Sequence, residues 1–196
     1  MDPVRTIALV AGIPFFAVAA RYRLRSQKSG EKLDRTREGW LILVGLRLAG
    51  LATLVSVVLC GAGSRRVAWA DLALPEALRW TGLALYLASL CWLIWMFHTL
   101  GTNLTDTVVT RRDAKLVRHG PYRYVRNPMY VGVLGLGWGL GTAFGTWLVP
   151  VCASVVFTFM AVRTRIEERY LIERFGAQYT DYMTRVNRFV PKRPRA

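Results

Sequence analysis

The chain has 196 residues, of which 53% are hydrophobic, and its mean hydropathy is positive. Its 27 lysines and arginines outnumber 12 acidic residues, which gives a net charge of +15. A charge of this sign is common in nucleic-acid-binding proteins. Here, however, the basic residues alternate with long apolar runs, and no nucleic-acid-binding motif is present. We therefore expect a membrane protein of one domain, residues 1–196, that binds no nucleic acid.

Five apolar segments follow one another along the chain, and each predicts a membrane helix. They cover residues 4–20, 41–60, 77–97, 129–142 and 146–162. A helix needs about 20 residues to cross the hydrocarbon core, so the second and third suffice, the first is slightly short and the fourth is marginal. We expect the fourth and fifth to form a tight hairpin that tilts or lies where the bilayer is thin. The predicted fold class is all-α, an integral membrane bundle of about five transmembrane helices.

Lysines and arginines gather on one side of these predicted spans. Residues 21–39 hold seven, residues 98–128 hold six and residues 163–196 hold nine, whereas the opposite side holds four. The positive-inside rule therefore places the N-terminus outside, and the C-terminal tail with its site in the cytoplasm, for a multi-pass protein of an inner or plasma membrane. The first segment precedes its arginines, the reverse of a secretory signal, so we expect it to be retained.

The cysteines and glycines predict packing, without a metal or dinucleotide site. The three cysteines lie in separate apolar segments and have no metal-ligand spacing, so we expect no metal. The run GLGWGLG in the fourth segment lacks the G-x-G-x-x-G spacing, and no strand precedes it. Gly137-x-x-x-Gly141 and Gly141-x-x-x-Gly145 are instead spacings that let membrane helices approach closely.

Polar residues collect just before the fourth segment. Asn127 is a good helix N-cap, and Pro128 suits the first helical turn. A helix N-terminus with Arg126 beside it predicts an anion site on the cytoplasmic face. The alternative is a plain basic loop that binds lipid headgroups.

A second polar cluster, Glu167 and Glu168, follows the fifth segment. We expect the fifth helix to continue through Phe175, with Gly176 as its C-cap, and an amphipathic helix over about 177–186 to lie on the membrane or fold over the site. One carboxylate could receive a ligand's ammonium or sugar hydroxyls. Otherwise, Glu167 forms a surface ion pair with Arg163. An anion site beside a cation site suits a zwitterionic ligand.

Two strings, LVRHGPYRYVRNPMYVG and RIEERYLIERFGAQYTDYMTRVNRFVP, resemble a known family. They are similar to the isoprenylcysteine carboxyl methyltransferase and phospholipid methyltransferase group of membrane-embedded, S-adenosylmethionine-dependent enzymes. The resemblance covers roughly residues 95–191. It divides the domain into three N-terminal spans, residues 1–97, and a methyltransferase-like catalytic region, residues 98–191.

The resemblance implies site residues by position. Those that would bind the cofactor, S-adenosylmethionine, are Leu116, Val117, Gly120, Tyr122, Arg126, Asn127, Pro128, Tyr130, Glu167 and Glu168. Those that would act on the acceptor are Arg188, Glu168 and Asn103. Asn127 stands where many relatives have histidine. An asparagine can donate a hydrogen bond to the cofactor carboxylate but cannot carry a proton.

The implied function is methyl transfer to a lipophilic acceptor that enters from the bilayer. Isoprenylcysteine-type carboxyl O-methylation, or reaction of a similar small hydrophobic acid or thiol, is the expectation. A carboxylate needs only orientation, by Arg188, whereas an amine or thiol would need a base such as Glu168 or a tyrosine. The alternatives are a phospholipid N-methyltransferase, an NADPH-dependent membrane reductase with a similar Arg and Glu-Glu arrangement, and a non-enzymatic lipid-binding membrane protein.

Overall fold

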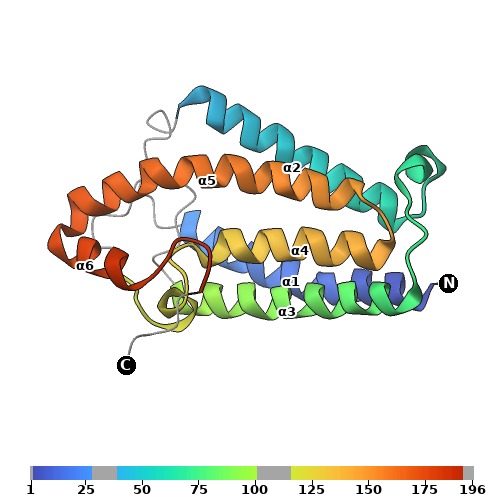
Figure 1. The fold of residues 1–196 in the computed structure, drawn as a ribbon, viewed down its shortest axis with the longest axis horizontal. Helices are drawn as coiled ribbons and strands as arrows, with labels where there is room; N and C mark the ends of the chain where they lie inside the picture. The colour runs from blue at the N-terminus through green and yellow to red at the C-terminus, as the bar shows by residue number, and fades with distance from the viewer. Residues whose placement is uncertain (1, 28–38, 101–115, 192–196) are drawn as a thin grey trace.

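The computed structural model describes residues 2–27, 39–100 and 116–191, which form a bundle of helices (Figure 1). The helices are α1 Pro3–Gln27, α2 Trp40–Gly61, α3 Glu76–Leu100, α4 Pro128–Phe144, α5 Leu148–Phe175 and α6 Ala177–Arg185, with short 3-10 turns η2 Arg65–Ala70 and η4 Gly120–Arg123. Each of the five predicted apolar segments is a helix, and the described residues contain no named strand. The all-α prediction is confirmed.

Four of these helices, α1, α2, α3 and α5, are long and apolar enough to cross a membrane, by length and composition. The fourth predicted span, α4, has 17 residues. At 1.5 Å per residue it is about 26 Å long, slightly less than the hydrocarbon core. Large apolar side chains such as Ile13, Phe16 and Leu48 are exposed on the outside of the bundle. This exposure is what lipid contact requires, because the surrounding solvent is itself apolar.

The short helix α4 is the centre of the bundle. It packs against α3 and α5, while α1 packs mainly on α3 and α2 mainly on α5 (Figure 1). Glycines permit this approach, as predicted. A Cβ at Gly139 would lie 2.5 Å from the backbone nitrogen of Tyr86 in α3, and Gly137 faces Ala153 of α5. Substitution at Gly139 would therefore force α3 and α4 apart.

The C-terminal end of α4 is closed by cations from other helices. Gly145 caps the helix in the left-handed conformation, with φ of 71°. Arg5 of α1 donates to the carbonyl of Phe144, and Arg79 of α3 donates to that of Ala143. Arg79 also pairs with Asp2. Guanidinium groups suit this position because the carbonyls at a helix C-terminus carry partial negative charge.

The opposite end of the bundle holds α6 and the last described residues. As predicted, α5 runs on to Phe175, and Gly176 ends it with a positive φ of 52°. The chain then turns into α6, which lies at the same end of the bundle as the start of α4 (Figure 1). Of the two arrangements expected for this amphipathic helix, its hydrogen bonds to Tyr122 and Arg126 match folding against the segment before α4.

Candidate functional site

The candidate site forms where the start of α4 meets the extension of α5 and the tail after α6. A parallel bridge joins Val125 to Asn187. The backbone N–H of Arg126 donates to Asn187, and that of Asn127 donates to Arg188. This pairing brings arginines 62 residues apart in sequence to the same carboxylate, and the sequence pattern contains no sign of it.

Glu168 is the centre of the first group of charges and is only 4% exposed. Arg126 Nη2 donates to its Oε1 at 2.7 Å. Arg188 Nε lies 3.0 Å from both carboxylate oxygens. The hydrogen bond to Glu168 raises the pKa of Arg188, so this guanidinium stays charged. A buried carboxylate held by two guanidiniums fixes the direction of both arginine side chains.

Glu167 is the centre of the second group. Tyr130 donates its hydroxyl to Glu167 Oε2 at 2.6 Å. Arg163 Nε lies 3.4 Å from Oε1, so the ion pair predicted one turn away is present. It is not a surface pair, however, because the Arg163 side chain is only 9% exposed. The two adjacent glutamates therefore have separate partners in a buried site.

The two groups together carry more positive than negative charge. Three guanidiniums, Arg126, Arg163 and Arg188, accompany two carboxylates. Asn127 stands at the N-cap of α4 as predicted, but its side chain makes no capping bond. Its Nδ2 is buried without a hydrogen-bond partner in the described part of the chain, as is Arg126 Nε. Because buried donors normally find acceptors, these atoms fit an anionic ligand group.

Helix α6 contributes residues to the site that the sequence did not assign to it. Tyr182 donates its hydroxyl to the Tyr122 carbonyl at 2.5 Å, and Arg126 Nη1 donates to the Met183 carbonyl at 3.1 Å. Burial raises the pKa of Tyr122, Tyr179 and Tyr182. These phenols therefore remain protonated at neutral pH. Apolar spacing predicted the helix, but spacing does not reveal which residues its tyrosines contact.

The remaining predicted residues lie around this centre. Pro128 starts α4 and is buried, Tyr122 lies in η4, and Val117 lies just before it. Leu116 packs against the cluster formed by Tyr179, Tyr182 and Val186.

Gly120 begins η4 with φ of +62°, and a Cβ there would collide with Thr99 of α3. Its requirement for glycine thus comes from packing of the turn as well as from any ligand. Asn103 lies outside the described residues. Within the described ranges there is no group of three residues that could hold a metal ion.

Known proteins are similar to this chain in sequence and in fold. The family model described as phospholipid methyltransferase matches residues 77–178, from α3 through the start of α6. The chain belongs to the phospholipid methyltransferase family. The matched region contains every predicted site residue except Arg188, and the three N-terminal spans contribute only α3 to it.

The matches to curated relatives also cover only part of each chain. The chain is 32% identical over 99 residues to protein-S-isoprenylcysteine O-methyltransferase of Saccharomyces cerevisiae, covering 48% of this chain and 41% of the relative. It is 38% identical over 103 residues to form B of that enzyme from Arabidopsis thaliana, covering 47% and 49%. For the Mus musculus enzyme the identity is 33% over 129 residues, covering 63% and 44%. The chain thus spans less than half the length of these relatives.

A solved structure shows the same fold. It is the eukaryotic intramembrane Ras methyltransferase, isoprenylcysteine carboxyl methyltransferase, with a TM-score of 0.55 and 24% identity. The match covers 76% of this chain and 51% of the other. This match and the four helices of membrane-spanning length together support an integral membrane protein.

Proposed function

We propose that this family member transfers a methyl group from S-adenosylmethionine to a lipophilic acceptor in the membrane, with a carboxylate of the isoprenylcysteine type as the methylated group. The observation that carries the proposal is the Arg126–Glu168–Arg188 cluster, in which two guanidiniums surround one buried carboxylate. Such a site favours anionic groups. The relatives named above are O-methyltransferases of this substrate class.

The residues fit the methionine part of the cofactor. When bound, the cofactor supplies an activated methyl group on a sulfonium, and the protein must bind and align it. Arg126, the free Nδ2 of Asn127 and the first turn of α4 offer donors for the carboxylate. Glu167 offers an acceptor for the amino group or the ribose hydroxyls. Leu116, Val117, Gly120, Tyr122, Pro128 and Tyr130 would enclose the remainder.

Glu168 takes a more specific role than the sequence indicated. Its two oxygens accept hydrogen bonds from Arg126 and Arg188. We therefore propose that Glu168 orients these two arginines. The side chain of Arg188 is 41% exposed, and its Nη1 makes no hydrogen bond within the described residues. That nitrogen is our candidate for holding the acceptor carboxylate in line with the methyl group.

Among the described residues, the sequence-based base candidates Glu168 and the tyrosines are poorly placed to remove a proton, which favours a carboxylate acceptor over an amine. Glu168 is held by two cations. Burial raises the pKa of Tyr122, Tyr179 and Tyr182, so these phenols stay protonated near neutral pH and cannot take up a proton. A carboxylate is already ionised and needs no proton removed before attack. Phospholipid N-methylation, the second candidate, is favoured only by the family description. We propose that the site faces the cytoplasm, because it lies among the most basic segments of the chain, which the positive-inside rule assigns to that side.

The test is ligand binding followed by turnover. Isothermal titration of the detergent-purified protein should show binding of S-adenosylhomocysteine and none of NADPH. Labelled methyl groups should then pass from S-adenosylmethionine to N-acetyl-S-farnesylcysteine and not to phosphatidylethanolamine. Binding of NADPH alone would establish a reductase instead, and binding of neither compound would support a lipid-binding protein. Methylation of the phospholipid alone would reverse the acceptor assignment.

A further inference from the structure

Helix α5 carries one exposed stripe that changes from apolar side chains to arginines along its length. Residues three and four apart lie on one face of a helix, and six residues follow this spacing on the outer face of α5. This α5 stripe consists of Val151, Val155, Thr158, Val162, Arg165 and Arg169. Its valines are exposed on the outside of the bundle, as residues in contact with lipid are. The two arginines therefore continue a stripe that faces lipid.

A tryptophan at the start of α5 indicates the depth of these arginines in the membrane. Trp147 is partly exposed and packs against Trp69, and such tryptophans are typical of the boundary between hydrocarbon and water. At 1.5 Å per residue, Arg165 and Arg169 lie about 27 Å and about 33 Å from Trp147 along the helix. The hydrocarbon core is about 30 Å thick, so the two arginines lie at its opposite boundary.

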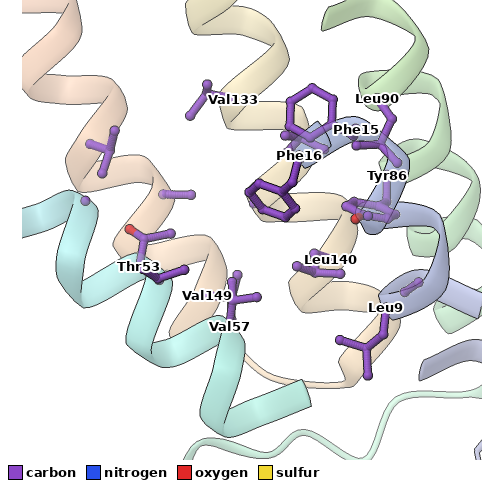
Figure 2. Close-up of a pocket in the computed structure, with 18 of the residues that line it drawn as sticks. Leu9, Phe15, Phe16, Thr53, Val57, Tyr86, Leu90, Val133, Leu140 and Val149 are labelled. Atoms are coloured by element: carbon purple, nitrogen blue, oxygen red, sulfur yellow. The ribbon is translucent and has the colours of Figure 1, made fainter. Parts of the chain in front are cut away.

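Helix α2 runs antiparallel to α5 and supplies a second measure of depth. A Cβ at Gly45, near the start of α2, would collide with the ring of Phe159 in α5. Near the other end of the bundle, Val57 of α2 and Val149 of α5 line the same apolar cavity (Figure 2). The two helices thus keep one antiparallel register along this length.

That register places Trp40 level with Arg165. Trp40 is the first residue of α2, five before Gly45, and it is 71% exposed. Because the helices are antiparallel, residues about five beyond Phe159 lie at the same depth as Trp40, and Arg165 is six beyond Phe159. Tryptophans on two different helices thus assign Arg165 to the same membrane boundary.

Neither arginine has a partner within the described structure. Both are exposed, and neither forms a hydrogen bond or ion pair with another described residue. Arg165 and Arg169 are four positions apart, so their Cβ atoms are about 5–6 Å apart and both guanidiniums can reach one phosphate group. The planar guanidinium suits this, because it donates two parallel hydrogen bonds to phosphate oxygens. The next exposed acidic residue along the helix, Glu173, lies one turn further from the membrane.

We propose that Arg165 and Arg169 bind the phosphate group of an anionic phospholipid, whose acyl chains lie along the apolar part of the α5 stripe. Anionic lipids at a membrane surface attract such cations. The occupant is a lipid and not free phosphate, because the apolar stripe leads directly to the two arginines. Glu168 lies between them in sequence but is buried in the candidate site, so the bound headgroup would lie beside that site. The proposal goes beyond methyl transfer and does not depend on it.

Exposed arginines without partners can be replaced with little effect on the fold. Arg165→Gln, Arg169→Gln and the double variant remove the charges of the proposed site. Arg174→Gln is the matched control. Arg174 is exposed on the same helix, but at about 100° per residue it lies on the face opposite Arg165. Thermal unfolding of each variant checks that the helices remain folded.

The experiment titrates the detergent-purified full chain with phosphatidylglycerol or phosphatidylcholine of the same acyl chains, and native mass spectrometry counts the bound lipids. The natural protein should bind its first phosphatidylglycerol about twentyfold more tightly than phosphatidylcholine. Each single variant should weaken phosphatidylglycerol binding about fivefold, and the double variant should remove the preference. Arg174→Gln should stay within about twofold of the natural protein, because its charge lies away from the stripe.

Three results would overturn the proposal. Equal affinity of the natural protein for the two lipids would mean that the arginines select no anionic headgroup. An equal loss in Arg174→Gln and Arg165→Gln would mean that the net charge of the chain, and not this pair, attracts the lipid. Displacement of the bound lipid by millimolar glycerophosphoglycerol, the headgroup without acyl chains, would mean that the site takes small soluble anions.

Discussion

The two ends of α4 both collect arginines, but they use them differently. At the C-terminal end, Arg5 and Arg79 donate to backbone carbonyls of Phe144 and Ala143. At the N-terminal end, Arg126 bonds Glu168 and the Met183 carbonyl, while the side-chain Nδ2 of the neighbouring Asn127 has no hydrogen-bond partner in the described residues. The first arrangement directs its donors at carbonyls of α4 itself, although Arg5 Nε has no partner in the described residues. At the second, unpartnered donors of two neighbouring residues, Arg126 Nε and Asn127 Nδ2, lie together at a helix N-terminus, where an anionic ligand group is favoured.

The strongest way to test this contrast is to remove the carboxylate at the N-terminal end. Glu168→Ala leaves Arg126 and Arg188 without their shared partner in a buried site. We expect the free energy of unfolding to fall by about 3–5 kcal/mol, as when one member of a buried ion pair is deleted. Denaturant titration in detergent would measure it. A loss below about 1 kcal/mol would show that solvent screens the cluster.

Arg126→Lys keeps the charge but removes the planar fork. We expect the dissociation constant of S-adenosylhomocysteine to rise about tenfold or more, because lysine cannot bond Glu168 and a ligand carboxylate together. Isothermal titration measures the change. His119→Ala is the control, since His119 is exposed near the same turn, and it should leave binding unchanged. If both variants weaken binding equally, the residues assigned to the cofactor are misplaced.

Arg79→Ala tests the other end of the helix. It removes the bond to Ala143 and the pair with Asp2. We expect about 1–2 kcal/mol lower stability, and no change in S-adenosylhomocysteine affinity, because this end has a structural role. Thermal unfolding and titration on the same sample give both values. Weaker ligand binding at unchanged stability would contradict the division between the two ends.

Asn127→Ala should weaken ligand binding without lowering stability, the reverse of Arg79→Ala. The side chain makes no capping bond and its Nδ2 has no partner among the described residues. The variant's free energy of unfolding should stay within about 0.5 kcal/mol of that of the natural protein. Its dissociation constant for S-adenosylhomocysteine should rise about fivefold. Asn127→Asp, which puts a negative charge at the same place, should weaken binding further. Lower stability with unchanged affinity would make Asn127 a structural residue.

The smallest expected effect concerns α6 and pH. Tyr182→Phe removes the bond to the Tyr122 carbonyl and should cost about 1 kcal/mol at pH 8. Burial raises the pKa of Tyr182 in the folded state, so its contribution is complete below the unfolded value of about 10 and is lost as pH rises beyond it. The stability difference between natural protein and variant should therefore narrow above pH 10. A constant difference would mean that Tyr182 does not titrate through this contact.

The sequence predicted what depends on local patterns and missed what depends on long-range pairing. Apolar run lengths located all five long helices, and Gly176 correctly marked the end of α5. Residue type and spacing singled out the Glu167–Glu168 pair and Arg126 as candidate site residues. The sequence did not show which arginine bonds which glutamate, because the bridge between Val125 and Asn187 joins segments that three helices separate. Asn127 occupies the N-cap position of α4 as expected, but its side chain makes no capping bond, and its backbone N–H pairs with Arg188.

That same bridge sets an order of assembly during biosynthesis. Glu168 enters the membrane-bound nascent chain twenty residues before Arg188, and until Arg188 is made the carboxylate has only Arg126. The helices can insert and pack first, since their contacts lie within residues 3–175. The proposed site is therefore complete only once the segment after α6 has been made. A chain cleaved before Asn187 would keep the sequence of all six helices but lack the second arginine of Glu168.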